Sequence, residues 1–239
     1  SIGDAGTLSF NVYKTITAGD GGMVITDDED LYRRCFALHD QGHSPNRKGV
    51  EIGQRPFIGL DFRMTELQGA VLLAQLRKLD GILARLRANK SYYKSLIADI
   101  PGLSFRTITD EAGECATLLV VYLPDESLAR KVAVELGTKV IADSGWHVYN
   151  NMEHLLNQFT VTPERCPYSC PYYTAKGGAV QYRAGMLPKT DDLLGRAINI
   201  SIGVSDPGLG SGFGVTAHAT PQEIEVSAAV FRRAVLKFG

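Results

Sequence analysis

Residues 9–26 read SFNVYKTITAGDGGMVIT, and this stretch is the most informative part of the chain. Lys14 stands between a short predicted strand, which ends near Phe10, and a glycine-rich turn at residues 19–22. Glycine has no Cβ and accepts positive φ, so such a turn lets the backbone approach a ligand closely. Ser9 precedes the lysine, where its hydroxyl could donate to a phosphate oxygen. A lysine in this position is usually a solvated surface residue, but these neighbours favour a ligand-binding role.

The same stretch resembles the region around the Schiff-base lysine of the DegT/StrS-type sugar aminotransferases, which are pyridoxal-phosphate (PLP) enzymes of fold type I. In that family a Ser-Phe pair, three residues and the lysine are followed by a Gly-acid-Gly-Gly turn and a short strand. The matching residues are Ser9-Phe10, Lys14 and Gly19-Asp20-Gly21-Gly22. The resemblance implies pyridoxal 5'-phosphate as the cofactor, Lys14 as the catalytic residue that carries it, and Ser9 as a cofactor-binding residue. The attacking amine must be neutral, which desolvation or nearby cations would favour.

A second match begins at Gly59, where the sequence reads GLDFRMTELQ. It resembles the family's G-x-N-x-R-M segment, whose loop reaches the partner subunit's active site and whose Asn touches the cofactor phosphate. The resemblance implies Asp61 as a cofactor contact, although this chain departs from the usual Asn. A carboxylate facing a phosphate dianion is unfavourable unless it is protonated or turned away. Arg63 is a candidate substrate-binding residue, because a guanidinium fork grips a carboxylate or phosphate at two points. An interface or surface salt bridge is the alternative for Arg63.

The rest of the chain is similar to the family's small C-terminal domain, through residues 187–200 and the tail from Thr220. His147 lies in the zone where related enzymes place substrate-facing residues. It is a candidate substrate contact, with a structural histidine as the alternative. The predicted fold class is α/β: a partial fold type I PLP-transferase large domain over residues 1–85 and a small C-terminal α/β domain over residues 86–239.

Hydrophobic periodicity and capping residues predict the elements of this fold. Strands are expected at residues 23–26, 103–105, 117–123, 139–142 and 197–202, and helices at 29–39, 65–97 and 126–136. A last helix begins after Thr220, where Pro221 and Glu223 complete a capping box. The Gly- and Pro-rich residues 40–60 are expected to form a long loop, and Gly81 suggests a kink in the long helix.

The composition excludes several other classes of protein. The chain has 25 Lys and Arg against 26 Asp and Glu, so no broad charged surface for nucleic acid or anionic lipid is indicated. Its apolar runs are far shorter than the roughly 20 residues of a membrane helix, and its start lacks the apolar stretch of a signal peptide. Cys166 and Cys170 have no second pair to complete a zinc site, so we expect no metal and four reduced thiols. A cytoplasmic protein is predicted.

The resemblance implies an aminotransferase that passes an amino group from an amino acid, glutamate or glutamine, to a keto-sugar, sugar nucleotide or related ketone. It also implies a homodimer with shared active sites. The sugar dehydratases of this superfamily replace the lysine, so Lys14 favours transfer over dehydration. The family's N-terminal part supplies the aspartate facing the pyridine nitrogen, the aromatic stacked on the ring and a phosphate-binding turn. By this comparison that part is absent, and we expect the chain alone to hold PLP poorly.

Two alternatives remain open at this point. The chain could be a catalytically inactive fragment, or a dimerisation or regulatory module of the same fold, with the long helix and the loop before it as the interface. A different PLP chemistry on the same scaffold, such as decarboxylation or racemisation, is the second alternative. Formation of the pyridoxamine form of the cofactor with glutamate would separate transamination from the latter.

Overall fold

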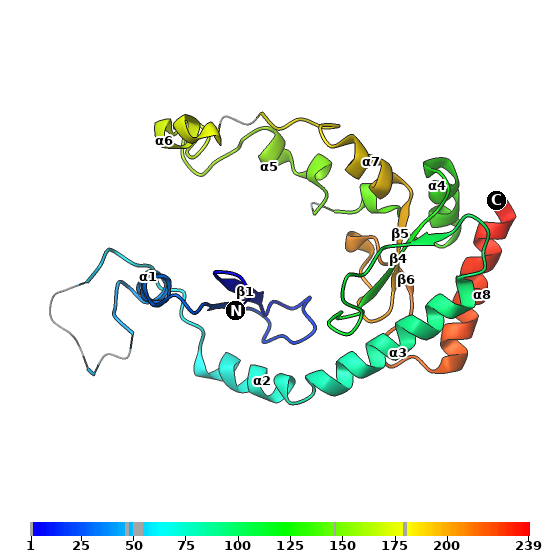
Figure 1. The fold of residues 1–239 in the computed structure, drawn as a ribbon, viewed down its shortest axis with the longest axis horizontal. Helices are drawn as coiled ribbons and strands as arrows, with labels where there is room; N and C mark the ends of the chain where they lie inside the picture. The colour runs from blue at the N-terminus through cyan, green and yellow to red at the C-terminus, as the bar shows by residue number, and fades with distance from the viewer. Residues whose placement is uncertain (1, 46–47, 50–54, 146, 179–180) are drawn as a thin grey trace. The chain divides into compact units, whose positions relative to one another are not determined.

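The computed structural model describes residues 2–45, 48–49, 55–145, 147–178 and 181–239. The chain divides into two compact units, Ser1–Gly81 and Ile82–Gly239 (Figure 1). The predicted boundary after residue 85 falls close to this division. The roles assigned to the two parts stay predictions.

The first unit begins with an antiparallel hairpin of β1 (Gly6–Ser9) and β2 (Gly22–Ile25). Its register pairs Gly6 with Ile25 and Ser9 with Gly22. The second strand lies one residue earlier than the predicted 23–26. Every residue of the two strands is at least partly exposed, so the hairpin has no buried face within this unit.

Helix α1 (Glu29–His39) has the bounds that the sequence predicts. Asp28 caps it, because its Oδ1 accepts hydrogen bonds from Asp30 N (2.9 Å) and Leu31 N (3.0 Å). A carboxylate at this position satisfies amide groups that have no partner inside the helix and also suits the helix dipole.

The chain after α1 returns along the end of the helix. Gln41 N donates to Leu60 O (2.9 Å), and Leu60 N donates to Leu38 O (2.7 Å). Gly59 permits this approach, since a Cβ built on it would lie 2.1 Å from Ala37 O. The described part of residues 40–60 is loop, as predicted, whereas 46–47 and 50–54 lie outside the described residues.

The prediction of a single helix over 65–97 was wrong. The structure has two helices, α2 (Glu66–Leu76) and α3 (Leu79–Ile97). Lys78 N donates to Gln75 O (3.0 Å), a bond that spans three residues instead of four and tightens the chain at this point. The helical ladder therefore breaks a few residues before Gly81, where the sequence suggests a kink.

The second unit is built on a four-stranded sheet of β3 (Ser104–Phe105), β4 (Leu118–Tyr122), β5 (Ala197–Ser201) and β6 (Phe213–Gly214). The strands lie in that order, with antiparallel pairing except for the parallel pair β5 and β6. All residues of β5 are buried, as expected for a central strand.

Two helices with the predicted starts, α4 (Glu126–Glu135) and α8 (Pro221–Phe238), complete the core of this unit together with α3. Helices α3 and α8 lie side by side (Figure 1), and Tyr93 Oη is 3.0 Å from Ser227 Oγ between them. The predicted capping box of α8 is confirmed: Thr220 Oγ1 accepts from Glu223 N (3.3 Å), and Thr220 N donates to Glu223 Oε2 (2.7 Å). The core gathers buried side chains of these helices and of β4 and β5.

The strand predicted at 139–142 was wrong. Ile141–Asp143 is a turn of 3-10 helix, and Val140 makes an isolated bridge to Ile198. Val140 is buried, so the apolar residues that suggested a strand pack against the sheet without extending it.

Residues between this turn and β5 form an excursion of short helices: η2 (Tyr149–Asn151), α5 (Glu153–Leu156), α6 (Pro171–Tyr173), η3 (Thr174–Gly178) and α7 (Pro188–Gly195). A further short helix, η4 (Pro207–Leu209), lies between β5 and β6. Among the described residues, no helix is both long enough and apolar enough to cross a membrane.

Candidate functional site

The loop between β1 and β2 carries the predicted cofactor lysine, and backbone hydrogen bonds close it. Phe10 N donates to Gly21 O (2.9 Å), and Ala18 N donates to Phe10 O (3.1 Å). Thr17 Oγ1 donates to the same carbonyl oxygen (2.9 Å). Phe10 is one of the few buried apolar residues of the first unit, with 7% of its surface exposed, so it anchors the loop.

Lys14 has an exposed side chain within this loop. Asn11 shapes the chain before it: its carbonyl oxygen accepts from Lys14 N (3.1 Å), and its Oδ1 accepts from Tyr13 N (3.2 Å). Ser9 is also exposed, at the end of β1, and its Oγ accepts a long hydrogen bond from Asn11 N (3.5 Å). The amine of Lys14 and the hydroxyl of Ser9 are therefore both accessible to a ligand.

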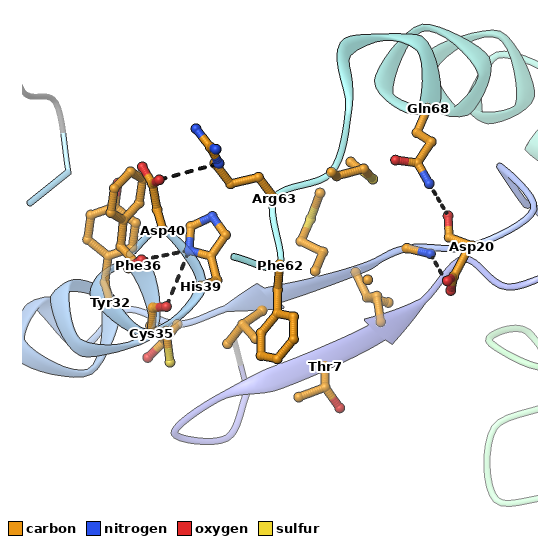
Figure 2. A pocket seen from close by; sticks show the side chains of 17 residues that line it. Thr7, Asp20, Tyr32, Cys35, Phe36, His39, Asp40, Phe62, Arg63 and Gln68 are labelled. Atoms are coloured by element: carbon orange, nitrogen blue, oxygen red, sulfur yellow. Dashed lines mark hydrogen bonds and ion pairs between the residues drawn. The ribbon is translucent and has the colours of Figure 1, made fainter. Parts of the chain in front are cut away.

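The glycine turn that ends the loop has the backbone conformation that its sequence favours. Gly19 and Gly21 have φ of 84° and 127°, values that residues with a Cβ rarely adopt. A Cβ built on Gly21 would lie 3.1 Å from Met64 Sδ, so the Met64 side chain rests against the turn. Gln68 Nε2 also donates to Asp20 O (3.3 Å) (Figure 2). The two sequence motifs, far apart in the chain, thus contact each other.

Asp61 and Arg63 form a two-point ion pair. Arg63 Nε donates to Asp61 Oδ1 (3.0 Å), and Arg63 Nη2 donates to Asp61 Oδ2 (2.9 Å). These hydrogen bonds hold the pKa of Asp61 at about 2, below its usual 3.8. Asp61 is therefore ionised at neutral pH, and protonation is not the route by which it would meet a phosphate.

A second carboxylate lies beside the same guanidinium. Asp40 is 5% exposed, and its Oδ1 lies 3.5 Å from Arg63 Nε. The structure therefore has Arg63 in salt bridges, the alternative that its sequence position left open. Binding of a substrate anion by Arg63 stays a prediction, since it would require the fork to turn from Asp61.

A cavity of about 950 Å³ lies between the hairpin and α1 (Figure 2). Its walls combine aliphatic side chains of the strands with Tyr32, Phe36 and His39 of α1, and Arg63 lies at its edge. His39 Nδ1 lies 2.7 Å from Phe36 O, and the two rings pack edge to face with centroids 5.0 Å apart. Of the predicted site residues, Arg63 is the one that lines this cavity.

His147 belongs to the second unit, at the start of the excursion, and its side chain is exposed. The residues after it are held firmly. Tyr149 Oη donates to Asp191 Oδ2 (2.9 Å), and Asn150 Nδ2 donates to Asp191 Oδ1 (2.9 Å). Tyr149 Oη also accepts from Leu187 N (3.1 Å). Hydrogen bonds thus hold the segment that follows His147 in place. The contact of His147 with a substrate stays a prediction.

The sequence reasoning missed Gln68 and Asp40. A signal for Gln68 was present, because a Thr followed three residues later by Gln at a helix start is a capping box, and such a glutamine is held in place. The contact of Asp40 with Arg63 had no comparable signal, since it joins residues on either side of a long loop.

The model of the DegT/DnrJ/EryC1/StrS aminotransferase family matches residues 1–203, which is most of the chain. The chain belongs to this family. The lysine loop and the 59–68 segment described above both fall within the matched region, as does the excursion with His147. The family resemblance inferred from those motifs is confirmed.

Curated relatives of the family match parts of the chain. A GDP-perosamine synthase of Caulobacter vibrioides is 40% identical over 98 residues, which cover 41% of this chain and 25% of that protein. An L-glutamine:2-deoxy-scyllo-inosose aminotransferase of Streptoalloteichus tenebrarius is 33% identical over 153 residues, which cover 57% of this chain and 36% of that protein. The matches thus span a quarter to about a third of the length of these relatives.

The solved structure of an aminotransferase from Psychrobacter cryohalolentis has the same fold. The TM-score is 0.67 at 21% identity, and the match covers 99% of this chain and 57% of that one. The predicted fold class, an α/β chain with part of the fold type I architecture, is confirmed by this coverage.

Proposed function

We propose that the chain provides the lysine-bearing part of a PLP-dependent aminotransferase. The amino group would pass from an amino acid, glutamate or glutamine, to a keto-sugar, sugar nucleotide or related ketone. The observation that supports this most is the contact between the glycine turn of the Lys14 loop and the segment at residues 61–68. The names of the relatives, which include an L-glutamine-dependent aminotransferase, support the donor and the sugar-like acceptor.

The residues of the first unit fit a cofactor that carries an aldehyde and a phosphate. Lys14 offers an accessible amine, and Ser9 offers a hydroxyl donor. Gly19 and Gly21 leave the backbone beside them free of side chains. Pyridoxal phosphate supplies an aldehyde carbon that exchanges amino groups and a ring that withdraws electrons.

Lys14 has two roles in this proposal. Its Nζ would hold the cofactor covalently, and when an amino donor replaces it there, the freed Nζ would move the proton between the donor Cα and the cofactor. Both roles need a neutral amine and a site from which water is largely excluded. Lys14 is exposed in this structure, so both roles require that its amine be shielded from water once cofactor and substrate are bound.

The remaining predicted residues bind and orient. Ser9 Oγ would donate to the cofactor phosphate, and Asp61 would border the same site, with Arg63 balancing its charge until the substrate binds. Arg63 and His147 are each proposed as a substrate contact, and the Arg63 guanidinium would be the anion-binding group. These assignments are proposals that rest on family membership together with the exposure of the Lys14, Ser9, Arg63 and His147 side chains.

Reductive trapping tests the central role of Lys14. The complete protein is incubated with PLP, reduced with borohydride and digested, and the modified lysine is located by mass spectrometry. We expect the label on Lys14 in clear excess over Lys189, an exposed lysine of the second unit. The Lys14→Ala variant should lose the label and the yellow colour. An equal label on both lysines, or none on Lys14, would contradict the proposal.

We further propose a cytoplasmic homodimer with shared sites. Helix α2 supports an interface, because Leu67, Val71, Leu73 and Leu76 have 47–80% of their surfaces exposed. The inactive alternative, in which the chain serves only as a dimerisation module, also uses this surface. Sedimentation velocity with and without PLP separates the two: a dimer that takes up no PLP and is unaffected by Lys14→Ala would favour the inactive module.

A further inference from the structure

Gln68 makes two different sets of hydrogen bonds with its side-chain amide. Its Oε1 accepts from Thr65 N (2.9 Å) and from Thr65 Oγ1 (3.1 Å), which is the capping box of α2. Its Nε2 donates in the opposite direction, to Asp20 O (3.3 Å) in the glycine turn (Figure 2). One amide group therefore joins the start of α2 to the turn that ends the Lys14 loop.

The acceptor of the second bond lies at the point where the loop closes. Gly21, the residue after Asp20, accepts the hydrogen bond from Phe10 N that brings the two ends of the loop together (2.9 Å). Its own N donates to Asp20 Oδ1 (2.8 Å). Met64 packs on the same glycine, so the turn is held by one side chain through van der Waals contact and by another through a hydrogen bond.

A second capping box, in the described helix α8, provides an internal comparison. In α8, Glu223 performs the capping role of Gln68, and its Oε2 accepts from Thr220 N (2.7 Å) and Thr220 Oγ1 (3.0 Å). A carboxylate therefore caps as well as an amide does, in keeping with the general preference for Glu or Gln at this position. Only an amide can also donate, so the bond to the glycine turn is what distinguishes glutamine at position 68.

We propose that Gln68 is a positioning residue for Lys14: it clamps the glycine turn to α2 and thereby fixes the loop that presents the amine. This inference rests on the proposed function of Lys14. Gln68 acts through the turn and makes no contact of its own with the reacting atoms in this proposal. Its effect is to narrow the range of positions that the loop adopts, which favours covalent capture of a carbonyl group at Nζ.

Gln68→Glu removes the hydrogen bond to the glycine turn and keeps the capping box of α2, because glutamate retains the acceptor for Thr65 and lacks the donor for Asp20. We expect amide hydrogen exchange at Phe10 and Ala18 to become about fivefold faster, the effect of losing one ordinary hydrogen bond. Two controls accompany it. Thr65→Ala weakens the capping box of α2 and retains the Nε2 donor of Gln68. Glu223→Gln replaces the carboxylate by an amide in the capping box of α8. Both should leave exchange at Phe10 and Ala18 within twofold of the wild type.

An unchanged exchange rate in Gln68→Glu would overturn the clamp, and so would an equal increase in Thr65→Ala, because the cap alone would then explain it. Reductive trapping with PLP provides the functional readout. The ratio of label on Lys14 to label on Lys189 should fall by about the same factor of five in Gln68→Glu, and in neither control.

The two readouts keep this inference distinct from the proposed function. If the wild-type protein labels Lys14 no more than Lys189, the proposed function fails, and hydrogen exchange still decides whether the clamp exists. If the wild type labels Lys14 selectively and Gln68→Glu does so equally well, the positioning role is overturned while the proposed function stands.

Discussion

The two units of the chain differ in how their residues are held. The second unit has a continuous core of buried side chains from three helices and a four-stranded sheet. The first has a two-stranded hairpin with exposed strands, and its described residues include few buried apolar ones, among them Phe10, Ala37 and Leu72. A two-stranded sheet is marginally stable without further packing. The residues proposed for cofactor chemistry thus lie where backbone turns and helix caps, rather than a core, fix their positions.

This contrast teaches where each unit is vulnerable. In the second unit a lost contact removes part of a shared core and is felt throughout it. In the first unit a lost hydrogen bond loosens one loop and leaves its neighbours in place. Substitutions that compare equivalent residues in the two units test this difference.

Truncation of a core phenylalanine should have the largest effect. Phe231 is fully buried in α8, and Phe231→Ala should destabilise the second unit by about 4 kcal/mol. Phe10→Ala, in the first unit, should cost about 1 kcal/mol and act mainly on the Lys14 loop. Urea unfolding followed by hydrogen exchange of each unit's peptides measures both. The control Val226→Ala, at a position of α8 that is 61% exposed, should change stability by less than about 0.5 kcal/mol.

An equal loss of stability in the two phenylalanine variants would break the comparison, because it would mean that the first unit has a core of its own. A larger loss of stability in Phe10→Ala with PLP present than with PLP absent would strengthen the contrast between the two units. Such a result would tie the anchoring of the loop to binding of the cofactor.

We expect the excursion of the second unit to loosen locally when a hydrogen bond is lost, as we expect of the first unit. Tyr149 Oη donates to Asp191 and accepts from Leu187 N, so Tyr149→Phe removes both bonds at once. We expect about a fivefold faster exchange at the Leu187 amide and earlier proteolysis of residues 151–186, with little change in the global unfolding midpoint. Tyr172→Phe serves as the control, since that ring is 83% exposed.

A global loss of stability in Tyr149→Phe would show instead that the excursion folds together with the core. Unchanged exchange at Leu187 would show that Asn150, which donates to the other oxygen of Asp191, is enough to hold the segment.

Several elements could be predicted from the sequence because their signals are local. The bounds of α1 follow from Asp28 and the helical pattern after it, and the start of α8 follows from Thr220, Pro221 and Glu223. The lysine loop was predicted because its glycines must adopt backbone conformations that few other residues accept.

The failures have equally specific reasons. The break between α2 and α3 falls at Arg77 and Lys78, two good helix formers that give no stop signal. The apolar run near Val140 is too short to separate a strand from a turn packed on the sheet. Arg63 meets Asp40 only because the chain folds back after α1, which no local pattern encodes.

The smallest effect is expected at the ion pair of Asp61 and Arg63, where both side chains are about half exposed. The pKa of Asp61 is lowered to about 2 in the folded chain from its usual 3.8. The contribution of the pair to stability is therefore present above about pH 4 and is lost as the pH falls towards 2. An NMR titration of the Asp61 carboxyl should give a midpoint near 2, and Arg63→Gln should move it up towards 3.8.

The second unit has a matching pair, in which Arg232 lowers the pKa of Asp99 between α8 and the end of α3. Arg232→Gln should likewise raise the pKa of Asp99, and Arg63→Lys should leave Asp61 between the two limits, because lysine keeps the charge without the fork. A midpoint near 3.8 for Asp61 in the wild type would mean that the guanidinium is not held by this carboxylate. Arg63 would then have to leave only Asp40 in order to bind an anionic substrate.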